Sequence, residues 1–104
     1  MARPKRCRKI HCEPDVRYYK PKGIPHFLLK EVGLSLDEFE ALRLADLNGL
    51  YQEEGAGQMG ISRQTFARIL DSAHHKIADV LVHGKALRIE GSITALGKEK
   101  KRRA

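Results

Sequence analysis

The clearest pattern along the chain is an amphipathic stripe in its second half. Its apolar positions are Phe66, Ile69, Leu70, Ala73, Ile77, Val80 and Leu81. Steps of three and four residues place such positions on one face of a helix. Ser62 is a natural N-cap before the stripe, and Gly84 is a natural terminator after it. The pattern therefore predicts a long helix that begins at Ser62 and continues to Val82.

A second helical pattern begins at Ser35. Ser35-Leu36-Asp37-Glu38 has the spacing of a capping box, in which the serine hydroxyl and the Glu38 carboxylate each accept from the other's backbone amide. Asn48-Gly49 provides a stop, so the predicted helix ends near Leu47. Its apolar residues cover more than one face, which indicates neighbours on two sides. They are Leu36, Phe39, Ala41, Leu42, Leu44 and Ala45.

Between these two helices, residues 51–59 predict a short helix followed by a tight turn. Ala56 is small enough for a close helix crossing, and Gly60, four positions later, tolerates the positive φ that a tight turn needs. A small core between the helices is predicted from Met59, Ile61, Phe66 and Ile69. Together these requirements predict a helix-turn-helix over residues 52–71.

The rest of the chain predicts little regular structure. Residues 10–33 are interrupted by proline and glycine and read as short extended pieces, with a strand or two among them. Residues 86–90 alternate between apolar and polar, as in a short strand. We expect a flexible basic arm at 1–9, one domain at 10–91 and a disordered basic tail at 92–104. The predicted fold is mainly α, with a three-helix core that contains the helix-turn-helix.

The charge distribution narrows the class of partner. Formal net charge is +7, from 20 Lys plus Arg against 13 Asp plus Glu. Residues 1–30 hold nine basic and two acidic side chains, whereas residues 31–60 hold one basic and seven acidic. The last seven residues hold five basic and one acidic. A chain that is basic at both ends indicates a polyanionic partner, although ordinary solvated charge remains an alternative.

The polar residues at the start of the long helix are the candidate DNA-reading face. Arginine can bind guanine with two hydrogen bonds, as glutamine can bind adenine, and a serine at a helix N-terminus can hold a phosphate. Asp71 is expected to orient Arg68 rather than to face DNA. A helical hairpin whose polar face merely meets water is the alternative. The predicted readers are Ser62, Arg63, Gln64 and Arg68.

The stretches DEFEALRLAD (37–46) and MGISRQTFARIL (59–70) resemble an uncharacterised family of small prokaryotic predicted DNA-binding proteins. The helical part of that family is similar to region four of bacterial sigma factors. The resemblance covers residues 3 to about 91 and implies a sigma-region-four-like fold. It also implies an alanine at position 55, where this chain has Gly55. Since glycine weakens a helix interior by up to ~1 kcal/mol relative to alanine, a loose short helix is expected.

Metal binding and catalysis are weaker hypotheses. Cys7 and Cys12 have a spacing seen for zinc ligand pairs, with His11 adjacent and His26 as a distant fourth candidate. The basic surroundings disfavour a cation, so we expect two reduced thiols and no cofactor.

The acidic side chains of the central helices fit dipole partners and solvated faces better than acid–base groups, and no nucleophile–base pair accompanies them. An enzyme is therefore not expected. These side chains are Asp37, Glu38, Glu40, Asp46, Glu53 and Glu54.

The sequence thus predicts a cytoplasmic DNA-binding protein that regulates transcription, with no membrane segment and no small-molecule substrate. The helix from Ser62 enters the major groove, and Arg3, Lys5 and Arg6 contact phosphates or the minor groove. A homodimer is left open, because one helix reads only a few base pairs. The alternative is a protein-interaction module that contacts the transcription machinery through an acidic surface at 37–54. Nonspecific RNA binding through the tails is a third hypothesis.

Overall fold

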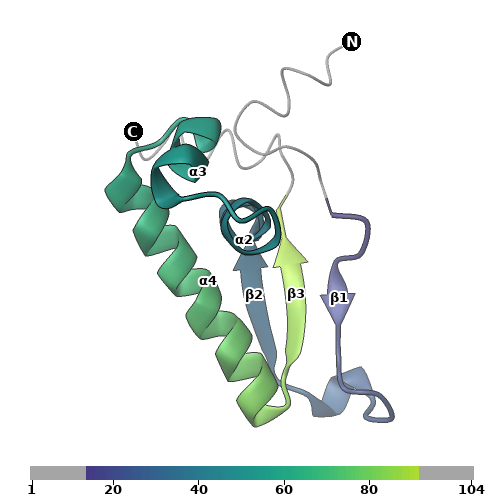
Figure 1. Ribbon diagram of the computed structural model, residues 1–104. Coiled ribbons are helices and arrows are strands. Elements are labelled where there is room, and N and C mark those ends of the chain that lie inside the picture. The colour runs from purple at the N-terminus through teal and green to yellow at the C-terminus, as the bar shows by residue number, and fades with distance from the viewer. Residues whose placement is uncertain (1–13, 92–104) are drawn as a thin grey trace.

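The computed structural model describes residues 14–91, which are mainly helical with a small three-stranded sheet (Figure 1). In the second half of the chain the helices and the strand follow the predicted pattern. In the first half, where a strand or two was expected, there are two strands. In chain order the elements are β1 (Tyr18–Tyr19), the 3-10 turn η1 (His26–Leu28), β2 (Glu31–Ser35), α2 (Leu36–Leu42), the π-helical turn η2 (Arg43–Leu47), α3 (Gln52–Met59), α4 (Arg63–His83) and β3 (Ala86–Glu90).

The sheet has the order β1-β3-β2, so the last strand lies in the middle. β3 is antiparallel to β1 and parallel to β2, with Leu34 opposite Ile89. A parallel neighbour requires a crossover connection, and all three α-helices of the described residues lie in it (Figure 1). The predicted strand at 86–90 is confirmed. The strands expected within 10–33 are β1 and β2, and β2 runs on to Ser35.

α4 closely matches the predicted long helix. The Ser62 hydroxyl accepts from the Thr65 amide at 3.1 Å, and Gly84 ends the helix with φ at 63°. The apolar stripe is correct as far as Val80, which packs against the sheet core. Leu81 does not belong to it, since this side chain is 75% exposed.

The helix predicted from Ser35 to Leu47 forms with a change of pitch. Both hydrogen bonds of the capping box are present, from the Glu38 amide to Ser35 Oγ at 3.2 Å and from the Ser35 amide to Glu38 Oε1 at 2.9 Å. After Leu42 the helix widens into η2, where the Asn48 amide reaches the Arg43 carbonyl at 2.9 Å. The expectation of neighbours on two sides is correct, because Leu42 packs against both apolar clusters of the molecule.

The two apolar clusters divide the molecule between sheet and helices. The sheet core packs β2 and β3 against α2 and α4 and consists of Leu34, Leu36, Ala73, Leu87 and Ile89. The helical core packs α2, η2, α3 and α4 together and consists of Ala41, Leu44, Ala56, Met59, Phe66 and Leu70. The small core predicted between the two helices therefore forms, with Ile61 and Ile69 partly buried at its edge. α4 contributes to both clusters.

The turn between α3 and α4 also has the predicted geometry. Gly60 adopts φ of 73°, in the left-handed region that favours glycine. Gly55 is buried where α3 meets α4, and a Cβ at this position would lie 2.5 Å from Cζ of Phe66. The alanine implied by the family resemblance would therefore collide with the Phe66 ring. Gly55 allows a close approach that the sequence pattern alone had suggested only for Ala56.

Candidate nucleic-acid interface

The N-terminus of α4 is fixed by two hydroxyl groups. Ser62 Oγ accepts from the Thr65 amide and donates to Thr65 Oγ1 at 2.9 Å. The Ser62 hydroxyl is therefore committed to the cap, which limits its predicted role as a phosphate donor. Thr65 is a partner that the sequence reading missed, although its position three residues after the N-cap was a usable signal.

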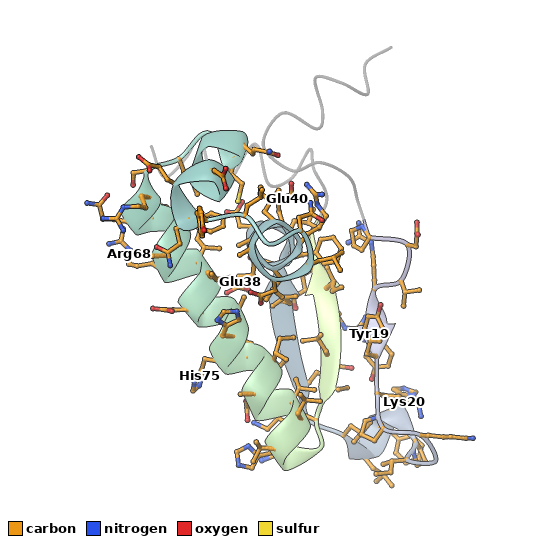
Figure 2. The ribbon with its side chains drawn as sticks, in the orientation of Figure 1. Tyr19, Lys20, Glu38, Glu40, Arg68 and His75 are labelled. Atoms are coloured by element: carbon orange, nitrogen blue, oxygen red, sulfur yellow. The ribbon has the colours of Figure 1, made fainter. Side chains whose placement is uncertain are left out.

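Three of the predicted readers lie outward on the first turns of α4. Arg63, Gln64 and Arg68 are exposed, and no carboxylate within residues 14–91 pairs with either arginine. Figure 2 shows Arg68 on the outer side of α4, with His75 further along the same side. The expected contact between Asp71 and Arg68 is absent: both side chains are exposed and neither is within bonding distance of the other. Arg68 is therefore free to meet an external acceptor.

The opposite face of α4 holds these side chains in place. Phe66 and Ala73 have no exposed surface, and Leu70 is 7% exposed. They anchor α4 in the helical core and in the sheet core, so the outward residues stand on a helix that is supported along its length. A site on such a support presents its side chains more accurately than a site on a loop.

A charged group inside the fold ties α4 to the elements before it. Glu38 points between α4 and the sheet (Figure 2) and accepts from Ser72 Oγ and, at 2.9 Å, from Lys76 Nζ. Lys76 also donates to the Gly33 carbonyl at 2.8 Å. Burial of Glu38 raises its pKa, but the bonds from Ser72, Ser35 and Lys76 together outweigh burial and hold the pKa below its usual value. Glu38 is therefore an internal link among β2, α2 and α4.

The acidic surface predicted over residues 37–54 is smaller than expected. Asp37, Glu38 and Glu40 are buried, so their assignment to solvated faces was wrong, although Asp37 and Glu38 do lie in the first turn of α2. The Glu40 carboxylate accepts two hydrogen bonds from the Arg43 guanidinium, from Nε at 2.9 Å and from Nη2 at 2.7 Å. Asp46 pairs with His74 at 2.7 Å. The exposed acidic residues of this stretch are therefore Asp46, Glu53 and Glu54.

Several predicted site residues lie outside the described residues. These are the phosphate-contact candidates Arg3, Lys5 and Arg6 and the metal-ligand candidates Cys7, His11 and Cys12. His26, the remaining ligand candidate, is exposed on η1 and its ring meets Phe27 edge-on. Within residues 14–91, no group of three or more His, Cys, Asp or Glu side chains could hold a metal ion. In the same range, no helix is both long and apolar enough to cross a membrane.

Comparisons with known proteins identify relatives over nearly the whole chain. A family model described as "Protein of unknown function DUF134" matches residues 1–95. A UPF0251 protein of Prosthecochloris aestuarii is 58% identical over 92 residues, an alignment that covers 88% of this chain but only 59% of that relative. A UPF0251 protein of Dehalococcoides mccartyi is 59% identical over 96 residues, covering 92% of this chain and 82% of the relative. No solved structure matches the chain significantly.

Proposed function

We propose that this chain, which belongs to the family described as "Protein of unknown function DUF134", is a sequence-preferring DNA-binding protein that regulates transcription. Membership agrees with the expected uncharacterised prokaryotic family. The proposal interprets α3, the Gly60 turn and α4 as a helix-turn-helix similar to sigma region four. The observation that supports it most is the exposed set of Arg63, Gln64 and Arg68 at the start of a helix anchored on its other face.

In this proposal the start of α4 enters the major groove. Arg63 and Arg68 suit the paired acceptors of guanine, and Gln64 suits the acceptor and donor of adenine. Because no carboxylate of residues 14–91 neutralises either arginine, their donors remain available for base edges or phosphates. The basic residues Arg3, Lys5 and Arg6 would add affinity through phosphates without reading sequence.

Arg68→Ala tests the reading face. A preferred site is first selected from randomised duplex DNA with the full chain, and binding to that site and to random duplex is then measured for each variant. We expect Arg68→Ala to weaken the selected site by about 1–3 kcal/mol and to leave random duplex unchanged. Lys22→Ala is the control, because Lys22 is an exposed cation on the segment between β1 and η1, which Figure 1 shows far from the start of α4. Equal losses on selected and random DNA would contradict the assignment of a reading face.

Deletion of residues 1–9 tests the basic arm separately. We expect the deletion to weaken binding to every sequence alike, because phosphate contacts carry no sequence information. It should also reduce the slope of log affinity against log salt concentration, which is measured by repeating the titrations at several ionic strengths. An unchanged salt slope would exclude the arm from the interface, and failure to select any DNA motif would overturn the proposed function itself.

A further inference from the structure

The end of the molecule opposite Arg68 collects exposed apolar side chains. Of the nine large apolar residues exposed within residues 14–91, six lie on β1, on the segment from there through η1, and on the last turn of α4; Figure 1 shows η1 and the end of α4 at the lower end of the molecule, away from α3. We call this set the distal surface; it consists of Tyr19, Ile24, Phe27, Leu28, Leu81 and Val82. Several are exposed to an extreme degree, with Phe27 at 74% and Leu81 at 75%. Exposed apolar side chains mark interaction sites where they lie side by side, as Tyr19 and Leu81 do where they line one hollow.

The distal surface is hollowed rather than flat. Two shallow hollows of about 480 and 370 Å³ meet at Gly84 and Lys85, which line both. Gly84 presents no side chain and leaves open space where a Cβ would stand. The first hollow is completed by Leu28, Leu29, Lys30 and His83, and the second by Tyr19, Lys20, Pro21, Val80 and Leu81. The second hollow is mainly apolar and the first is mainly polar, and lysine side chains line both.

The charge at this edge is positive and largely uncompensated. The ammonium group of Lys20 is bonded only to backbone carbonyls, at 2.8 Å from that of Ile24, and Lys30 has no carboxylate partner within residues 14–91. Lys85 and His83 converge on one carboxylate, Asp79, at 2.9 and 2.7 Å. The described residues that line the two hollows thus include three lysines and no carboxylate.

We propose that the distal surface binds an amphipathic helix with acidic flanks from a partner protein. An amphipathic helix presents its apolar side chains along one stripe, which suits the apolar second hollow beside Tyr19 and Leu81, and its acidic flanks would meet Lys20, Lys30 and Lys85. A second copy of this chain is disfavoured, because an isologous contact would bring the same cations face to face. A bilayer is disfavoured because recessed walls receive individual side chains better than they insert into lipid. The inference does not depend on DNA binding.

The test selects helical peptides against the full chain. A display library of short helices, with apolar residues fixed in one stripe and all other positions random, is enriched for binding to the immobilised protein. We expect the enriched peptides to carry net negative charge and to bind in solution, measured by fluorescence anisotropy. A library that yields no binder, or yields neutral or basic binders, would overturn the proposal.

Variants of exposed residues locate the binding surface without disturbing the fold. Leu81→Ser and Lys30→Glu should each weaken a selected peptide about tenfold, which corresponds to ~1.4 kcal/mol. Leu47→Ser is the matched control, because Leu47 is a leucine of similar exposure, 79% against 75%, on a different element. DNA binding by Leu81→Ser should equal that of the unmodified chain, so failure of one function is distinguishable from failure of the other.

Two further measurements address the other occupants. Vesicles of anionic phospholipid are sedimented with the full chain and with Leu81→Ser, and we expect the two proteins to bind them equally. In analytical ultracentrifugation we expect the two proteins to have the same mass in solution. Vesicle binding that requires Leu81 would assign the surface to a membrane, and dimerisation that requires Leu81 would assign it to a second copy. Either result would overturn the proposed partner.

Discussion

Single side chains decide how closely α3 can approach α4. Gly55 lies beneath the Phe66 ring, and Ala56 beside it is only 3% exposed. Two adjacent small residues therefore let the two helices share the helical core without displacing Phe66. The conformational cost of glycine in a helix is offset here by the fit of a large ring that is itself fully buried.

We predict that Gly55→Ala destabilises the protein. Alanine favours helix by up to ~1 kcal/mol over glycine. Its Cβ, however, would lie 2.5 Å from Cζ of Phe66, and overpacking of this kind typically costs about 1–3 kcal/mol. We expect a net loss in the free energy of unfolding, measured by urea denaturation with circular dichroism.

Gly57→Ala is the control in the same helix. A Cβ at Gly57 meets nothing within 4 Å, so this variant should gain stability from helix propensity alone. Gly55→Ala combined with Phe66→Leu should recover part of the loss by removing the colliding ring. A stabilised Gly55→Ala would show that α3 is loosely packed, as the sequence pattern had implied.

The exposed position of the proposed reading face was predictable because it depends on local helical geometry. Once Ser62 is identified as the N-cap, the 3.6-residue repeat fixes which side of α4 carries Arg63, Gln64 and Arg68. The burial of Glu38 was not predictable in the same way, since its partners Ser72 and Lys76 come from a helix more than thirty residues later in the chain. An acidic residue near a helix start is more often solvated than enclosed.

At the scale of whole elements, Glu38 and Lys76 fasten strand β2 and helix α2 to α4. The Lys76 ammonium bonds both the Glu38 carboxylate and the Gly33 carbonyl, so one side chain of α4 contacts two elements. The Lys30 carbonyl accepts from the Ala86 amide of β3. Backbone carbonyls along a strand point alternately to its two sides, so the Gly33 carbonyl, three residues later, points away from β3, toward the unpaired edge of β2. Lys76 therefore also covers an unpaired carbonyl of an edge strand.

We predict that Glu38→Gln lowers the free energy of unfolding at neutral pH by about 1.5–3 kcal/mol, the range for hydrogen bonds to a charged group. The pKa of Glu38 lies below its usual 4.5 in the folded protein. Its ionised form therefore stabilises the fold above that usual value, and this contribution is lost as pH falls through the lowered pKa. Urea titrations of both proteins across that range should show the difference shrinking as the solution becomes acidic. A difference that is constant with pH would mean that the charge of Glu38 contributes nothing.

The helices and the strand at 86–90 were predictable as elements, whereas the pairing of the strands into a sheet was not. Caps and stops at Ser35, Ser62, Gly60 and Gly84 are local signals, and each acts where it was expected. The pairing of Glu31 with Ala86 joins positions on either side of the whole helical segment. Such a contact depends on how α2 and α4 pack, and no pattern among neighbouring residues of the sequence predicts it. The π-helical widening after Leu42 likewise has no signal in the apolar spacing.

At the scale of the molecule, α4 connects the two apolar clusters. Its first half packs into the helical core through Phe66, and its second half packs into the sheet core through Ala73. At 21 residues it is about 30 Å long, so it also joins the proposed reading face to the distal surface. The two clusters should therefore unfold as one unit.

We predict that Ile89→Ala, a change in the sheet core, weakens the helical core as well. Ile89 is 4% exposed, and truncating a buried isoleucine typically costs about 2–5 kcal/mol. Hydrogen exchange measured by NMR should show comparable loss of protection for the most protected amides of β3 and of α3. Undiminished protection in α3 would mean that the helical core is an independent unit.

The parallel pairing of β2 with β3 has a consequence for protein synthesis. A ribosome makes the chain from its N-terminus, at roughly 5–20 residues per second. β2 therefore emerges well before the central strand that it needs, and it must wait while residues 36–85 are added. During that interval Leu34 has no Ile89 to pack against, and the helical core lacks the complete sheet core to which α4 couples it. A chain interrupted before residue 86 would thus leave the apolar side chains of β2, α2 and α4 that face Leu87 and Ile89 without their partners, which is the kind of product that chaperones and proteases recognise.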